Sequence, residues 1–219
     1  MQKNMQKNIS LILANTRRSY FYFNEIKKNK IYIDTIIFYS KKKNKLFELI
    51  KKYPLKKKLH FIKIEDINSK LIIDLTEKIK SEFILFSGYS AEIVKNKNIF
   101  KKNLIHCHPG LLPKYRGSTV IYYSLIEDKK INVSLFKLTK KIDQGEVLYT
   151  QEFKIPNKII SIEKDYDDKI RSKTLISFLL SVKNKIKKKY STDLNAYYIA
   201  HPCLRNILID PNYYLIDKK

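Results

Sequence analysis

Short apolar runs alternate with amphipathic segments through the first half of this 219-residue chain, and this alternation constrains the fold more than any other feature. The runs have the length of buried strands, and the segments between them repeat apolar residues at helical spacing. We expect strands at Ile9–Ala14, Asp34–Tyr39, His60–Ile64, Glu82–Phe86 and Leu104–Cys107. We expect helices at Arg17–Lys28, Lys45–Tyr53 and Ile67–Lys80. On the inward faces of the first and third helices, the spacing places Tyr20, Phe23, Ile26, Leu71, Leu75 and Ile79.

The second half of the chain follows a different pattern. Val133–Leu138 and Glu146–Ile155 predict antiparallel strands on either side of a turn at residues 143–145. One long amphipathic helix is predicted from Ser161 to Lys189, and the tail from Tyr197 to Asp217 is expected to add a last strand or hairpin. Strands that alternate with helices form right-handed crossovers and a parallel sheet. The sequence thus predicts the α/β class: an open, mostly parallel, twisted sheet of Rossmann-like type, with helices on both faces and antiparallel strands toward the C-terminal part.

Length and composition favour one main globular unit. At ~150 residues per domain, this length makes one domain or one domain with a small appendage. We expect a main domain over residues 1–190 and a C-terminal extension over residues 191–219 packed on it. The apolar runs are too short to span a membrane, no signal-peptide core precedes the first strand, and two cysteines make no disulfide framework. We therefore expect a soluble, cytoplasmic protein without membrane association, and we leave a homodimer open.

The net charge is +24, from 45 basic and 21 acidic residues, and it first suggests a nucleic-acid or anionic-membrane partner. Few of the basic residues are arginine, the residue that binds phosphate in a bidentate manner and stacks on bases. The lysines occur in runs, such as residues 41–43, 56–58 and 187–189, where solvated helix faces and turns are expected. We interpret the charge as a solvated surface and regard nucleic-acid binding as the weaker alternative.

The chain has only four glycines, and all of them lie between residues 88 and 145. A sequence so poor in glycine keeps the residue where a tight turn or the close approach of a ligand demands it. Two of the four histidines, His106 and His108, lie in the same segment. This segment is therefore the predicted functional site.

His106 and His108 are the central candidates in this segment. They are two residues apart, so they project to the same face of an extended strand. Pro109 cannot continue a central strand, which places both imidazoles at the carboxyl end of a parallel strand, where ligands bind in open α/β sheets. Asp143 follows in a turn, and its carboxylate can orient a histidine and support the cationic form.

A metal site is the alternative use of these histidines. Imidazole and thiolate ligands suit zinc or copper, and the ligands would be His106, Cys107, His108, His201 and Cys203. Cys107 should point away from its two neighbours on a strand, and no C-x-x-C pair is present. No bound metal is therefore expected.

A longer pattern around these residues resembles the folate-dependent formyltransferase family. It runs from Leu104 to Gly117 and continues through Val133–Leu138 and Ile142–Leu148. The family includes methionyl-tRNA, glycinamide-ribonucleotide and nucleotide-sugar formyltransferases, and its signature is Asn-x-His-Pro-x-Leu-Leu-Pro-x-x-Arg-Gly followed by an Asp-x-Gly loop. The resemblance implies that residues 1–190 form the catalytic domain of a one-carbon group transferase with 10-formyltetrahydrofolate as its co-substrate.

The resemblance also implies roles for individual residues. The family's catalytic Asn, His and Asp map onto His106, His108 and Asp143. In the family, the Asn donates a hydrogen bond to the formyl oxygen as it becomes an oxyanion. An imidazole N–H also donates, so we expect His106 to take this role and His106→Asn to keep activity. We expect Lys114 and Arg116 to hold an anionic group of the acceptor. The co-substrate is expected to be bound by Phe86, Ser87, Gly88, Tyr89 and Ile142.

The acceptor expected by elimination is a primary amine of a nucleotide-linked sugar. The transfer-RNA enzymes usually carry a further C-terminal domain, and only residues 154–219 follow the matching segment here. The glycinamide-ribonucleotide enzymes carry a glycine-rich phosphate loop where this chain has Leu13–Ser19 without glycine. Three alternatives remain open: a methionyl-tRNA formyltransferase-like enzyme, a 10-formyltetrahydrofolate hydrolase, and a non-catalytic basic binding protein on a decayed formyltransferase scaffold.

Overall fold

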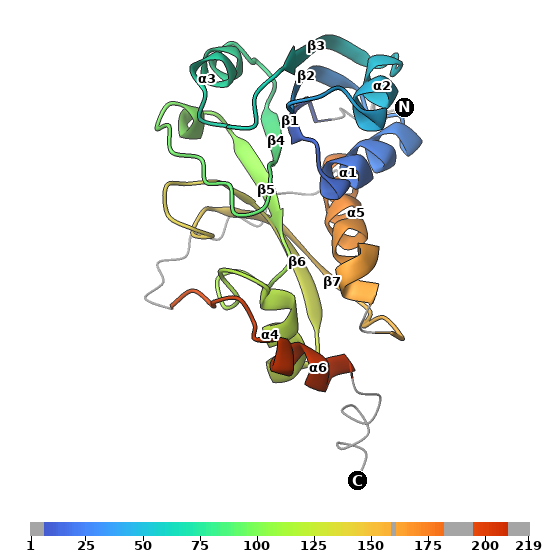
Figure 1. The fold of residues 1–219 in the computed structure, drawn as a ribbon, viewed down its shortest axis with the longest axis vertical. Coiled ribbons are helices and arrows are strands. Elements are labelled where there is room, and N and C mark those ends of the chain that lie inside the picture. The colour runs from blue at the N-terminus through green and yellow to red at the C-terminus, as the bar shows by residue number, and fades with distance from the viewer. Residues whose placement is uncertain (1–6, 159–160, 182–194, 210–219) are drawn as a thin grey trace.

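The computed structural model describes residues 7–158, 161–181 and 195–209, and its centre is one seven-stranded sheet (Figure 1). The strands are β1 (Ile9–Ala14), β2 (Ile33–Tyr39), β3 (Lys56–Ile62), β4 (Phe83–Ser87), β5 (Leu104–His108), β6 (Ile131–Lys137) and β7 (Val147–Phe153). Their order in the sheet is β3-β2-β1-β4-β5-β6-β7. Strands β1 to β5 are parallel, whereas β6 pairs antiparallel with both β5 and β7. The fold class predicted from the sequence is therefore confirmed.

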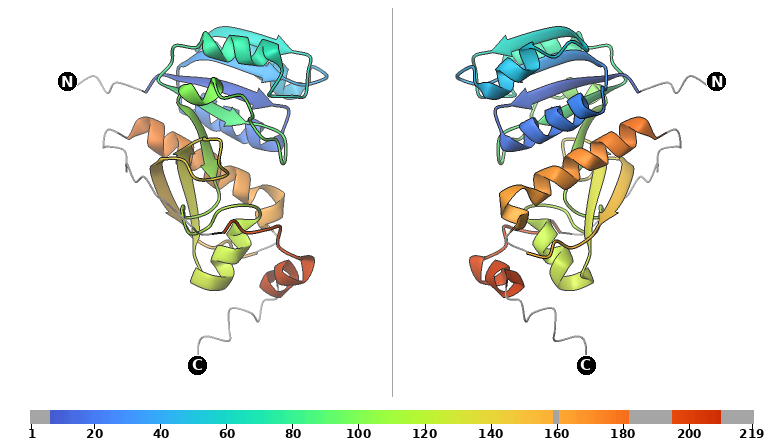
Figure 2. Two further views of the ribbon diagram at one scale, coloured as in Figure 1. Left: turned by 90° about the vertical axis from the view of Figure 1, so that its left-hand side faces the viewer. Right: turned by 90° about the vertical axis from the view of Figure 1, so that its right-hand side faces the viewer.

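Helices cover both faces of this sheet. They are α1 (Arg17–Lys28), α2 (Lys45–Lys51), α3 (Lys70–Glu77), α4 (Val120–Asp128), α5 (Asp167–Leu180) and α6 (Pro202–Ile209), with a 3₁₀ turn at Ile99–Lys101 and a π-helical turn at Ile162–Tyr166. Helices α1 and α5 pack side by side on one face, and α3 lies on the other (Figures 1 and 2). Helix α6 packs against α4. Within the described residues, no helix is both long and apolar enough to cross a membrane.

Side-chain alternation divides the apolar core into one layer on each face of the sheet. In β5, Ile105 and Cys107 are buried in the layer beneath α1 and α5. Successive side chains of a strand point to opposite faces, so His106 and His108 lie on the other face. Both imidazoles there contact Phe136 of β6 in edge-to-face geometry. The shared face predicted for the two histidines is therefore present.

The inward faces of α1 and α3 agree with the prediction only in part: Phe23 and Ile26 are fully buried as expected, but two other residues are not. Tyr20 is 41% exposed, whereas Tyr22 is fully buried. Leu71 is 50% exposed, whereas Ile72 is fully buried. In each helix several large apolar residues follow one another directly, so spacing alone does not decide which of them faces the sheet.

Strand β3 begins at Lys56, before its predicted start at His60. It is the first strand in the sheet order and pairs with β2. Charged side chains are tolerated on an edge strand because one side of it is not covered by another strand. The lysine run at 56–58 therefore belongs to a strand, although the sequence predicts a solvated helix face or a turn there.

The C-terminal part departs most from the prediction. The helix predicted over 161–189 ends at Leu180, because Ser181 adopts an extended backbone conformation (φ −68°, ψ 128°). Helix α6 begins at Pro202, where the sequence predicts a strand or hairpin. Proline favours the first helical position because the N–H that it lacks would be unpaired there. Helix α4 has no counterpart among the predicted elements, and residues 182–194 and 210–217 lie outside the described part of the chain.

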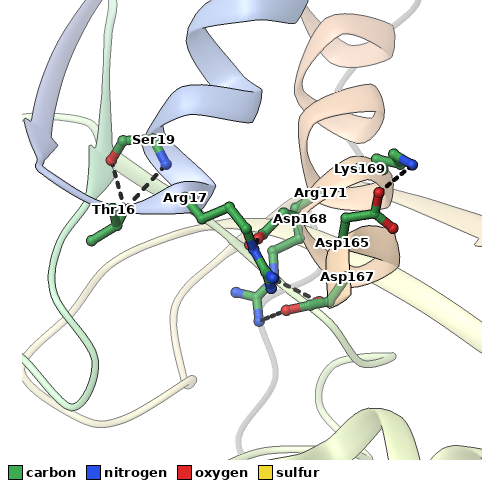
Figure 3. Close-up of polar contacts among 8 residues, drawn as sticks. All are labelled: Thr16, Arg17, Ser19, Asp165, Asp167, Asp168, Lys169 and Arg171. Carbon is green, nitrogen blue, oxygen red and sulfur yellow. Dashed lines mark hydrogen bonds and ion pairs between the residues drawn. The ribbon is translucent and has the colours of Figure 1, made fainter. Parts of the chain in front are cut away.

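Charged side chains join α5 to β5 and to α1. Figure 3 draws those of α1 and α5. Arg171 donates from Nη1 to the carbonyl oxygen of Cys107 in β5 (2.9 Å), and its Nε and Nη2 each lie 2.8 Å from the carboxylate of Asp167. Arg17 at the start of α1 pairs through Nε with Asp168 (2.6 Å). Arg171 is only 8% exposed. These contacts hold α5 against the back of the strand that carries the two histidines.

Arg171→Met should destabilise the protein, because it removes the partner of Asp167 and the donor to the Cys107 carbonyl. We expect the free energy of unfolding to fall by about 3 kcal/mol, the lower end of the loss when one partner of a buried ion pair is removed. Lys169→Ala on the same helix is the control. Its pair with Asp165 is largely exposed, so its loss should cost less than about 1 kcal/mol.

Urea denaturation followed by circular dichroism measures both variants. Equal losses in Arg171→Met and Lys169→Ala would contradict the role given to Arg171.

Candidate active site

The residues after β1 and β4 meet where the strand order of the sheet reverses. Thr16 caps α1, since its hydroxyl accepts a hydrogen bond from the N–H of Ser19 (3.1 Å). Arg18 then donates from Nη2 to the carbonyl oxygen of Gly88 (2.9 Å), and the Ser19 hydroxyl bonds that of Ser87 (2.9 Å). In sheets of this kind, ligands bind in the crevice outside the carboxyl ends of the strands at such a reversal.

A pocket of about 830 Å³ opens at this crevice. Polar side chains of its lining include Arg18, His106, Lys140, Lys141 and Asp143. Its lining also includes apolar side chains that are largely exposed: Ile93 (53%), Ile142 (59%), Tyr198 (88%) and Ile199 (72%). Polar groups combined with exposed apolar side chains suit a ligand that has both polar and aromatic parts.

His106 lies in the pocket wall with one ring nitrogen engaged. Its Nδ1 is 3.1 Å from the carbonyl oxygen of Phe86, at the end of the neighbouring strand β4. Burial, followed by the charges of Arg18 and Arg171, lowers the pKa of His106 well below its ordinary value. The side chain is therefore neutral at neutral pH.

His108 is more deeply placed than His106, and both of its ring nitrogens face oxygen atoms. Its Nε2 donates to the carbonyl oxygen of Tyr115 (2.7 Å), and its Nδ1 lies 3.5 Å from Oδ2 of Asp143. Burial lowers the pKa of His108, whereas the Asp143 carboxylate acts in the opposite direction. His108 is only 4% exposed and does not line the pocket, so it contacts Asp143 from behind the pocket wall.

Asp143 connects His108 to the pocket. It sits in the turn between β6 and β7 with a left-handed backbone (φ 52°), and its Oδ2 accepts a hydrogen bond from the N–H of Gly117 (2.8 Å). Gly117 itself has φ 100°, a backbone conformation that residues with a side chain rarely adopt. The sequence prediction that His108 and Asp143 meet agrees with this geometry.

The tail forms part of the pocket wall, which the sequence reasoning missed. The N–H of Tyr197 donates to the carbonyl oxygen of Arg116 (2.7 Å), and its own carbonyl accepts from the N–H of Ser118 (3.0 Å). The Tyr197 ring packs against Tyr115 and Tyr123, with centroids 5.8 and 4.5 Å away. Tyr198 and Ile199, named above, follow directly. No motif marks this segment in the sequence.

Most of the residues expected to bind the co-substrate line the pocket, namely Phe86, Gly88, Tyr89 and Ile142. Ser87 is the exception, because it is buried and its hydroxyl bonds Ser19.

Glu92 fixes the loop that follows β4, and the sequence did not mark it. Its Oε2 accepts from the hydroxyl of Tyr39 (2.5 Å) and the N–H of Tyr89 (2.8 Å), and its Oε1 accepts from the N–H of Ile67 (2.8 Å). The carboxylate therefore ties the loop after β4 to β2 and to the turn before α3. Such contacts join distant segments, so no local spacing announces them.

Lys114 and Arg116 lie outside the pocket lining. Lys114 pairs with Asp128 of α4 (2.6 Å). Arg116 is 3% exposed, and its Nε and Nη1 find no hydrogen-bond partner in the part of the chain that is described. The cations that line the pocket are instead Arg18, Lys140 and Lys141, so the expectation for Lys114 and Arg116 has no support from their positions.

The metal alternative finds no support in the described residues, which contain no group of three potential ligands. Cys107 is buried and faces α5, away from both histidines. Cys203 lies in α6 and is exposed.

Most of the sequence matches a known family. The family model described as "Formyl transferase" covers residues 7–176. The chain belongs to the formyl transferase family. His108 lies beside Asp143, and His106 lines the same pocket as Asp143; the catalytic roles that the resemblance implies for them stay predictions.

Relatives of this chain match it over part of their length. It is 35% identical over 176 residues to the "Bifunctional polymyxin resistance protein ArnA" of Wigglesworthia glossinidia brevipalpis, which covers 76% of this chain and 26% of that protein. It is 32% identical over 114 residues to a methionyl-tRNA formyltransferase of Finegoldia magna. This match covers 51% of this chain and 36% of that protein. The chain thus spans well under half the length of these two relatives.

A solved structure shares the fold. The sugar N-formyltransferase from Shewanella sp FDAARGOS_354 superimposes with a TM-score of 0.54 at 17% identity, covering 91% of this chain and 85% of that one. The likeness at this identity concerns the architecture of the sheet and its helices.

Gly117→Ala should separate the tail from the loop that follows β5. A Cβ at this position would overlap the carbonyl oxygen of Tyr197, and the backbone would also be strained. Losing one backbone hydrogen bond costs about 1 kcal/mol, so the amides of Ser118 and Tyr197 should exchange roughly fivefold faster than in the parent protein.

Hydrogen exchange followed by NMR measures these amides. Ser118→Ala is the control, since it adds no atom next to Tyr197. Unchanged exchange in Gly117→Ala would show that the tail does not depend on this contact.

Proposed function

We propose that the protein transfers a formyl group from 10-formyltetrahydrofolate to a primary amine, and that the amine belongs to a nucleotide-linked sugar. Family membership supports the formyl transfer. The observation that carries the acceptor is a pocket lined by His106, Asp143 and three cations together with exposed aromatic and aliphatic side chains.

The pocket has properties that fit a reduced folate. It combines an apolar lining from Phe86, Tyr89 and Ile142 with the polar groups named above. At Gly88 an added Cβ would overlap the Glu92 carboxylate and the Phe86 ring, so glycine lets the loop after β4 pack closely against both side chains. A planar ring system with hydrogen-bonding edges is the kind of ligand that such a wall recognises.

The same pocket has properties that fit a nucleotide-linked acceptor. Arg18, Lys140 and Lys141 supply positive charge for a diphosphate. Tyr198 offers an exposed ring for stacking on a base.

Asp143 and His108 support the chemistry together. Asp143 keeps its carboxylate at the pocket through the N–H of Gly117, and His108 lies behind it. Attack by an amine places positive charge on the nitrogen as it bonds the formyl carbon. The Asp143 carboxylate at the pocket stabilises that charge until the proton leaves.

Two measurements test the proposal. Calorimetric titration with a stable folate analogue should give saturable binding to one site. Incubation with 10-formyltetrahydrofolate and a panel of nucleotide-linked amino sugars should then release tetrahydrofolate with at least one sugar and form its N-formyl product. No binding at millimolar analogue would overturn the folate part of the proposal.

The control arms identify the competing functions. Folate turnover without any amine would indicate a hydrolase. Formylation of charged initiator transfer RNA, with tight binding at physiological salt, would indicate a transfer-RNA enzyme instead. We expect RNA binding to be weak at that salt, because the charge that we assign to the lysine surface is screened.

A further inference from the structure

His106 stands where the formyltransferase pattern has an asparagine, and its surroundings decide which ring nitrogen can react. Nδ1 lies 3.1 Å from the carbonyl oxygen of Phe86. A carbonyl oxygen only accepts hydrogen bonds, so Nδ1 must carry a proton in this contact. In the neutral imidazole the other nitrogen, Nε2, then has a free lone pair and accepts rather than donates.

Nε2 of His106 is accessible from the pocket. The atom has no hydrogen-bond partner among the described residues. It is also absent from the buried polar atoms that lack a partner, so part of its surface is open. The ring also lines the pocket wall. Phe86 and Phe136 lie on either side with ring centroids 6.4 and 6.1 Å from that of the imidazole, so apolar packing helps to hold its orientation.

The charged groups around His106 keep it neutral. Arg18 acts on it from α1 and Arg171 from α5, and His108 lies two residues away on the same strand. Asp143 shares the pocket from the turn after β6. Burial and the two arginines lower the pKa of His106, whereas the Phe86 carbonyl acts in the opposite direction without reversing the shift.

We propose that Nε2 of His106 is the proton acceptor for the attacking amine, a role opposite to that of the oxyanion donor implied by the family's asparagine. The inference rests on the proposed function. As the amine nitrogen bonds the formyl carbon, the carbonyl electron pair moves to the formyl oxygen and one N–H proton moves to Nε2. Arg18, the guanidinium of the same pocket, is then the cation available to the negative oxygen.

The second half of the step restores His106. The bond between the formyl carbon and N10 of the folate breaks, and the oxygen electron pair re-forms the carbonyl. N10 receives the electron pair of the broken bond and takes the proton from the His106 imidazolium. The products are the formamide and tetrahydrofolate, and no further reactant is needed.

Nitrogen-15 NMR of the histidine side chains tests the tautomer without any ligand. The chain has only four histidines, and His106→Asn identifies the signals of His106 by their loss. At neutral pH we expect a protonated Nδ1 and an Nε2 with a free lone pair, and imidazolium should appear only below 6.5, the ordinary pKa. A protonated Nε2 at neutral pH would overturn the proposal.

Kinetics test the role in the reaction. Loss of a general base lowers the rate by about 10²-fold or more, so His106→Asn should lower kcat by that factor while the KM for folate changes little. This expectation is the reverse of the one derived from the family pattern. His60→Asn is the matched control, because His60 lies in the edge strand β3 and outside the pocket lining. Parental turnover in His106→Asn would overturn the proposal.

The two experiments separate the inference from the proposed function. If the parent protein turns over no amine, the proposed function fails and this step fails with it. If the parent is active but Nε2 is protonated, only the role of His106 fails.

Discussion

Cys107 lies between the two histidines of β5, and its carbonyl oxygen accepts a hydrogen bond from Arg171 (2.9 Å). A buried guanidinium needs counter-charge, and the carboxylate of Asp167, one turn earlier on α5, supplies it. Helix α5 is therefore fixed to the strand by a directional contact and not by apolar packing alone. His106 and His108 project from the same short strand to the opposite face. The position of both imidazoles thus depends on a contact made behind the sheet.

The sequence contains the information for the sheet and for part of the site. Strands such as Ile9–Ala14 were predictable because β-branched and apolar residues follow one another in short runs. His106, His108 and Asp143 were predictable because the local pattern around them is long and because the alternation of a strand places the two histidines together. Which tyrosine of α1 faces the sheet was not predictable, because Tyr20 and Tyr22 are chemically identical. Only packing against the sheet makes Tyr22 buried and Tyr20 exposed.

Other parts of the site depend on contacts that no local pattern records. Glu92 holds the loop after β4 through Tyr39, and Tyr197 reaches the loop after β5 from the far end of the described chain. Lys114 looked available for an anionic acceptor because α4 was not predicted. The acidic end of that helix, at Asp128, occupies it.

Arginine and lysine have different uses in this chain. Arginine is rare, and Arg17, Arg18 and Arg171 all make defined contacts around the site and the helix that supports it. The lysines pair at the surface, as Lys41 does with Glu65. A planar guanidinium can satisfy several acceptors in fixed directions, which an ammonium group cannot. The arginines therefore serve the geometry of the site, and the large net charge follows from the lysines.

Gly117 joins two parts of the molecule that the chain separates widely. Its N–H holds Asp143, and the peptide groups on either side of it pair with Tyr197. Binding energies at two sites that share one element are reciprocal, so a ligand that orders the Asp143 loop also orders the tail, and the converse holds. The tail lies beyond residue 176, where the match to the family ends. A change of sequence there can alter the wall of the pocket without touching the part of the chain that matches the family.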